Sequence, residues 1–122
     1  LLRSVGQMGG HMEWYQELYT GDSIQGKTDR IKWKIIHNAG QLGIYVIALA
    51  SNPENLFDII PSWELMQKHY PKRQLVIIGL AKGWEEAVEV VKQIITEIYE
   101  RTGGFDVRNY LSIQSTESRG KT

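Results

Sequence analysis

Four residues at two segment junctions have types that suit the binding of an anion. Ser51 and Asn52 follow one apolar run, and Lys82 and Gly83 follow another. Lysine supplies positive charge, serine and asparagine supply hydrogen-bond donors, and glycine allows a close backbone approach. If a helix begins at each junction, its free N–H groups favour negative charge as well. The junctions are therefore a candidate site for a phosphate-bearing small molecule, and the alternative is that these residues only cap helices.

The segment 27–34 combines basic residues with an aromatic one, a composition found on surfaces that bind single-stranded nucleic acid. Asp29 interrupts the segment, and on a strand Trp33 would face away from Lys32 and Lys34. The formal net charge of the chain is zero, so no general attraction to nucleic acid is expected. We interpret the lysines as protection of a strand edge, and nucleic-acid binding through 27–34 is the weakest of three functional alternatives.

The side chains that most often perform catalysis or hold metals form no motif. Cysteine is absent, which excludes thiolate nucleophiles, disulfides and cysteine zinc sites. His11, His37 and His69 have no partner at ligand spacing. No phosphate-binding loop, dinucleotide-binding turn, serine elbow or metalloprotease helix occurs. The sequence predicts no metal site and no cofactor, identifies no catalytic residue, and favours a non-catalytic protein while leaving catalysis open.

Two apolar runs and one long amphipathic segment are the elements that would position these residues. Residues 44–50 and 75–81 are apolar throughout, which predicts strands that are buried on both faces. Residues 84–101 carry apolar side chains at helical spacing and end before a glycine pair, which predicts a helix. Because the 24 residues between the apolar runs, 51–74, contain helix signals, we expect a right-handed βαβ unit over 44–81.

Shorter segments complete the predicted architecture. We expect a helix over 12–19 and, over 31–35, an edge strand that forms a hairpin with the next strand. Helical pieces are expected over 51–60 and 63–69, and 105–113 fits either a helix or an edge strand. The predicted class is α/β, with α+β as the alternative. The fold is a small two-layer sandwich in which a mixed sheet of three or four strands packs against one long helix.

The length of 122 residues suits one domain, which we expect over 12–113. Residues 1–11 are glycine-rich near their end and lack periodicity, which predicts a disordered upstream extension or cloning remnant, with Met12 as the start of the functional chain. The polar residues 114–122 predict a flexible tail. The chain has no apolar run long enough to cross a bilayer and no secretory signal, so we expect a cytoplasmic location without membrane contact.

Four tryptophans are a large supply of aromatic surface for a chain of this length. Trp33 and Trp84 are expected in the core, whereas Trp14 and Trp63 begin short helices, where an indole is often partly exposed. A narrow sheet with one long helix leaves apolar surface uncovered, and a two-fold dimer is the commonest way to bury it. The leading prediction is a non-catalytic accessory or protein-interaction module that forms a homodimer through Trp14 and Trp63. Binding of an anionic small molecule at the junctions is the alternative.

Overall fold

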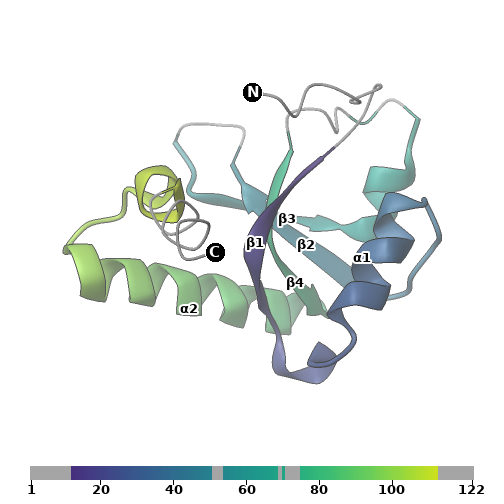
Figure 1. Ribbon diagram of the computed structural model, residues 1–122, viewed down its shortest axis with the longest axis horizontal. Helices are drawn as coiled ribbons and strands as arrows, with labels where there is room; N and C mark the ends of the chain where they lie inside the picture. Colours follow the sequence, from purple (N-terminus) through teal and green to yellow (C-terminus); the bar gives the residue numbers. More distant parts are fainter. Residues whose placement is uncertain (1–11, 51–53, 69, 71–74, 113–122) are drawn as a thin grey trace.

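The computed structural model describes residues 12–50, 54–68, 70 and 75–112 (Figure 1). In chain order the elements are β1 (Glu13–Thr20), the 3-10 helix η2 (Asp22–Ile24), α1 (Thr28–Ile36), β2 (Ile44–Leu49), β3 (Phe57–Pro61), the 3-10 helix η3 (Ser62–Met66), β4 (Val76–Lys82) and α2 (Trp84–Thr102), followed by helical turns over 107–112. The expectations for 1–11 and 114–122 lie outside the described residues.

The strands form one mixed sheet in the order β1-β4-β2-β3. β4 runs parallel to β1 and antiparallel to β2, and β2 is antiparallel to β3. The central strands β2 and β4 are buried along most of their length, as their apolar sequences require. The strands predicted over 44–50 and 75–81 are confirmed, and so is the α/β class with a mixed four-stranded sheet and one long helix.

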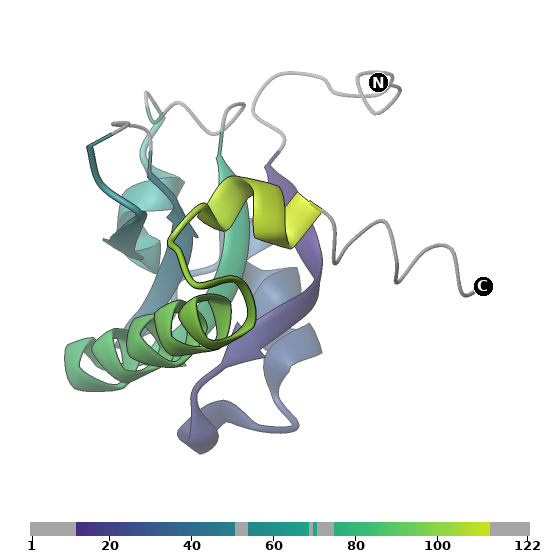
Figure 2. The same ribbon diagram turned by 90° about the vertical axis from the view of Figure 1, so that its left-hand side faces the viewer.

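The long helix α2 packs on one face of this sheet, together with the helical turns over 107–112 (Figure 2). A stripe at three- and four-residue spacing along α2 is buried against the sheet, as an amphipathic helix on a core requires. The buried residues of this stripe are Ala87, Val90, Ile94 and Ile98. The helix predicted over 84–101 is confirmed, and the segment 105–113, for which helix and strand were both open, contains helical turns.

Trp84 lies outside the core, although its spacing placed it in the buried stripe. Its side chain is 55% exposed, and its ring meets the ring of Tyr45 edge-on at 6.0 Å between centroids. Because α2 begins two residues after Lys82 ends β4, the first turn of the helix lies at the end of the sheet rather than over it.

The opposite face of the sheet is covered by α1 and η3 (Figure 1). Ile31 and Ile35 of α1 and Leu65 of η3 are buried in a second core cluster with residues of β2 and β4. The sequence analysis expected one long helix to leave a face of the sheet uncovered for a partner copy. Two shorter helical elements cover that face, so this argument for a dimer does not hold.

Residues 13–20 form the strand β1, so the helix predicted over 12–19 is wrong. Trp14 and Leu18 pack toward α1, and Tyr15 and Tyr19 pack toward α2. A spacing of four residues fits one helical turn and also an even step along a strand, so this spacing cannot separate the two. Pairing with β4 and the preference of aromatic residues for strands decide in favour of the strand.

The strand predicted over 31–35 is also wrong, because these residues lie within the helix α1. Ile31 and Ile35 are buried one turn apart, whereas Trp33 is 57% exposed on the outer side of the helix. The alternating pattern of 31–35 includes Ile31 and Ile35 four residues apart, and this spacing places them on one face of a helix as well as on one face of a strand. With no strand here, the hairpin expected with the following strand does not form.

The βαβ unit predicted over 44–81 does not form, because β2 and β4 run antiparallel. The chain between them makes the strand β3 where a helix was expected over 51–60. The helical piece expected over 63–69 is confirmed in part, because η3 is a 3-10 helix over Ser62–Met66. β3 is an edge strand, where Pro61 at its end is compatible with the ladder of hydrogen bonds. The short apolar run that ends at Pro61 is therefore compatible with a helix and with an edge strand, and its pattern does not distinguish them.

Candidate functional site

The two junctions predicted to form one anion site are separated by the direction of the strands. Lys82, at the end of β4, pairs with Ile44 at the start of β2, whereas Leu49 ends β2 beside Phe57. Parallel strands would have brought both junctions to one edge, and the antiparallel pairing removes that basis. Ser51 and Asn52 lie outside the described residues, so of the predicted set only Lys82 and Gly83 are placed.

The first turn of α2 already holds a carboxylate from its own chain. Glu86 accepts hydrogen bonds from the backbone N–H of Lys82 (2.8 Å) and from the N–H (3.0 Å) and hydroxyl (2.8 Å) of Ser23. Partial burial acts to raise the pKa of the Glu86 carboxyl, but these hydrogen bonds lower it more, so the net pKa lies below its ordinary value. Glu86 therefore occupies donors that an external anion would need, and it joins η2 to α2.

A groove of about 420 Å³ between α1 and the loop 40–44 has the strongest positive character among the described pockets. Its lining includes four cationic side chains and no carboxylate. The apolar lining comes from η2, α1 and the loop. The charged and polar residues of this basic groove are Ser23, Lys27, Arg30, Lys34, Gln41 and Lys82.

Helical spacing brings the basic side chains of 27–34 to the groove. Lys27 directly precedes α1, and Arg30 and Lys34 lie within it; spacings of three and four residues place the three side chains on one flank of the helix. The side-chain amide of Gln41 donates a hydrogen bond to the Ile31 carbonyl (3.2 Å) and so ties the loop to α1. This hydrogen bond fixes the position of the loop 40–44 relative to α1, the two segments between which the groove lies.

Lys82 reaches the same groove from the end of β4. The N–H of Gly83 donates to the carbonyl of Gly43 (2.7 Å), which fixes the loop beside the end of this strand. Gly43 has a positive φ of 76°, and the Lys82 side chain passes close to the place where a Cβ of Gly43 would stand. A Cβ would meet Lys82 only at ordinary contact distance, so it is the positive φ of the turn that favours glycine at 43.

The four cations of the basic groove are not neutralised by acidic partners. Over the ranges that the structure describes, no ion pair joins any of them to another side chain. The chain as a whole has zero formal net charge, whereas the groove lining has four cationic side chains and no carboxylate. Like charges one turn apart, as at Arg30 and Lys34, repel each other slightly, and a bound anion would reverse that cost.

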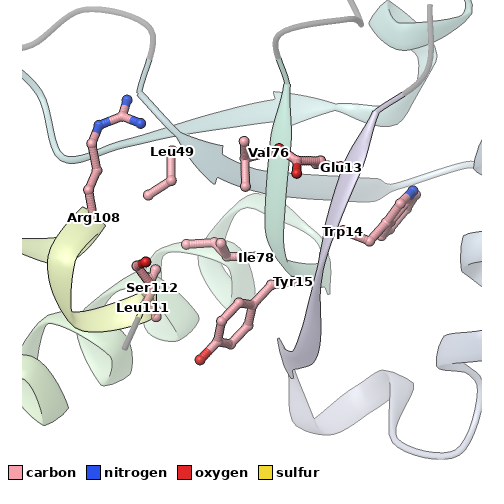
Figure 3. A pocket seen from close by; sticks show the side chains of 9 residues that line it. All are labelled: Glu13, Trp14, Tyr15, Leu49, Val76, Ile78, Arg108, Leu111 and Ser112. Carbon is pink, nitrogen blue, oxygen red and sulfur yellow. The ribbon is translucent and has the colours of Figure 1, made fainter. Parts of the chain in front are cut away.

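A second pocket of about 290 Å³ lies between β1, β4 and the helical turns over 107–112 (Figure 3). Its rim carries both Glu13 and Arg108, and its floor includes Leu49, Val76 and Ile78. Arg108 donates a hydrogen bond to the Ala50 carbonyl at 2.6 Å, so its guanidinium is partly engaged by the fold. Opposite charges at the rim and a mainly apolar floor give this pocket no preference for anions.

Glu97 on α2 accepts hydrogen bonds from two tyrosine hydroxyls, an arrangement that no sequence pattern indicated. Tyr19 donates to Glu97 Oε2 at 2.9 Å, and Tyr110 donates to the same oxygen at 2.6 Å. Burial and the hydrogen bond to Glu97 raise the pKa of Tyr110 to about 12, and they raise the pKa of Tyr19 as well. Both phenols stay protonated at neutral pH, and the arrangement ties β1 and the 107–112 turns to α2.

The histidines are placed only in part. The His37 ring stacks on Trp33 with 4.0 Å between centroids, and its Nδ1 lies 2.8 Å from the Trp33 carbonyl oxygen. His11 and His69 lie outside the described residues. Within the described ranges, no group of three or more His, Cys, Asp or Glu side chains could hold a metal ion.

The two tryptophans predicted at a dimer interface start from opposite edges of the sheet. Trp14, on the edge strand β1, packs partly buried against the core, and Lys32 Nζ lies 5.1 Å from its ring centroid. Trp63, on η3 after the other edge strand, is 56% exposed. Of the two, only Trp63 offers most of its ring to solvent.

Comparison with known proteins gives no relative from which a site can be transferred. No protein-family model, curated protein sequence or solved structure matches the chain. None of the helices in the described part is both long and apolar enough to span a bilayer. The function is therefore argued from the geometry of the sites alone.

Proposed function

We propose that the protein is a binding module for a phosphate-bearing small anion, which it holds in the basic groove without transforming it. The observation that carries this proposal is the convergence of Lys27, Arg30, Lys34 and Lys82 on one groove that has no acidic lining residue. Lysine and arginine form charge-assisted hydrogen bonds with phosphate oxygens, and arginine can form two at once.

The size of the basic groove favours a small ligand. Pockets that bind small molecules typically enclose roughly 300–1,000 Å³, and the volume of about 420 Å³ falls in this range. The mixture of cations with the apolar side chains of Ile24, Ile31 and Ile44 suits a ligand with both a charged and an uncharged part. Of the residues predicted from sequence, Lys82 and three basic residues of 27–34 belong to this proposal.

The proposal is tested by titration calorimetry with inorganic tripolyphosphate, a ligand that carries charge and nothing else. We expect binding at about 50 mM salt and clearly weaker binding at about 200 mM. Added salt shortens the distance over which exposed charges attract each other, which is about 10 Å at 100 mM. Glycerol, which is uncharged, is the control ligand. Failure to bind tripolyphosphate at millimolar concentration in low salt would reject the proposed function.

A second candidate function, self-association into a homodimer, is favoured by one feature of η3. Trp63 is 56% exposed and Met66 is 40% exposed. A 3-10 helix has three residues per turn, so these side chains lie one above the other on the same side. Aromatic residues and methionine are enriched at protein interfaces. This candidate keeps Trp63 of the predicted interface pair and does not use Trp14.

Sedimentation at micromolar concentration tests self-association. If η3 forms the centre of a dimer, replacing Trp63 by alanine should weaken the dimer roughly tenfold or more, because a buried tryptophan at an interface centre often dominates binding. Trp84→Ala removes an equally exposed indole on α2 and is the matched control. A wild-type protein that sediments as a monomer would eliminate this candidate.

A further inference from the structure

Trp33 lies on α1, the helix that carries Arg30 and Lys34 of the basic groove, but it is not itself one of the residues that line the groove. Arg30 is three residues before Trp33, so these two side chains are neighbours on the surface of α1. Arg30 lines the groove, and it therefore connects the indole to the groove. On the strand predicted over 31–35, Trp33 would face away from the lysines, so stacking on Trp33 and phosphate binding by the lysines could not occur together. On the helix α1 this separation does not exist, and the exposed indole is a surface neighbour of Arg30, one of the groove's cations.

The indole of Trp33 is positioned as one half of an aromatic pair. Its ring and the His37 imidazole stack with 4.0 Å between centroids and 23° between planes. The ring is nevertheless 57% exposed. The two rings together form a platform on the outer surface of α1, one turn beyond Arg30.

We propose that the ligand of the basic groove is a nucleotide, whose phosphates bind to Arg30 and Lys34 and whose planar base stacks on Trp33. This inference rests on the proposed function and adds the class of the ligand. A stacked base would use the exposed indole, which His37 holds in place one helical turn from Arg30, because every base has an aromatic face and stacks without sequence preference. The same chemistry is presented by a free mononucleotide and by single-stranded nucleic acid.

The experiment compares three ligands by titration calorimetry: tripolyphosphate, adenosine triphosphate and a short single-stranded oligonucleotide. We expect adenosine triphosphate to bind the wild type more tightly than tripolyphosphate. Replacing Trp33 by alanine should weaken adenosine triphosphate binding roughly 5- to 150-fold, the range found for one stacked base, and leave tripolyphosphate binding unchanged. Trp33→Phe, which keeps an aromatic face, should retain most of the affinity. Trp84→Ala, which removes an indole of matching exposure at the start of α2, should change neither affinity.

The outcomes separate this inference from the proposed function. Equal affinities of the wild type for tripolyphosphate and adenosine triphosphate, or unchanged nucleotide binding by Trp33→Ala, would overturn the nucleotide and leave the anion-binding module in place. Absence of binding to every phosphate ligand would overturn both. Tighter Trp33-dependent binding of the oligonucleotide would support the inference with single-stranded nucleic acid as the source, and tighter binding of adenosine triphosphate would support it with a free nucleotide.

Discussion

Replacing Ile94 by alanine is expected to lower the free energy of unfolding by about 2–5 kcal/mol. Ile94 has no exposed surface, and it lies in the middle of α2 in the core cluster that contains Ile47 and Ile78. Truncation removes buried methyl groups and leaves a cavity that packed neighbours fill only partly. Urea denaturation, followed by circular dichroism, measures the loss.

The adjacent residue supplies the matched control for this substitution. Gln93 is exposed on the other side of α2, so Gln93→Ala should change the free energy of unfolding by no more than about 0.5 kcal/mol. Equal denaturation midpoints for Ile94→Ala and Gln93→Ala would contradict the packing of α2 described above.

Reversing two charges in the basic groove is expected to lower the affinity for tripolyphosphate by about 100-fold or more, because like charges in a binding site cost several kcal/mol. The double variant Arg30→Glu with Lys34→Glu puts two carboxylates where the proposed ligand needs cations. Arg30 is exposed and Lys34 is partly exposed, and neither belongs to the buried stripe of α1, so the fold should persist.

A second double variant controls for the change in total charge. Lys92→Glu with Arg101→Glu alters the net charge by the same amount at exposed positions of α2, outside the groove. It should bind tripolyphosphate with nearly the wild-type affinity. A similar loss of affinity in both double variants would show that total charge, rather than the basic groove, controls binding.

The elements predicted correctly from sequence are those whose pattern is long or uniform. Residues 44–50 and 75–81 have no polar interruption, and the stripe of 84–101 runs through several turns. The errors fall where a short segment offers only one pair at four-residue spacing. Such a pair, for example Trp14 with Leu18, satisfies a strand and a helix at once, and only tertiary pairing decides between them.

The prediction that the two central strands run parallel was wrong for a related reason. The 24 residues between the two apolar runs contain three prolines and several helix-capping residues, which predicted a helical crossover. An additional edge strand, β3, ends at Pro61 instead and turns the chain back, so β2 and β4 run antiparallel. Short apolar runs near prolines carry too little pattern to exclude an edge strand.

The candidate site was predictable in its parts but not in its assembly. Lys82 and the basic segment 27–34 were identified as two unrelated candidates, because they are separated by about half the chain. Their meeting depends on α1 being a helix and on Gly43 turning the loop toward β4. The strand interpretation also placed Trp33 on the wrong side of the lysines, which hid its position next to Arg30 on the surface of α1.

The central claim is that the basic groove is the site that binds phosphate-bearing anions. Amide NMR spectra of the ¹⁵N-labelled protein, recorded during a titration with tripolyphosphate, locate the bound anion directly. We expect the largest shifts at Lys27, Arg30, Lys34 and the side-chain amide of Gln41, with little change at Leu111 in the second pocket. Shifts centred on the second pocket, or no shifts at saturating tripolyphosphate, would contradict the claim.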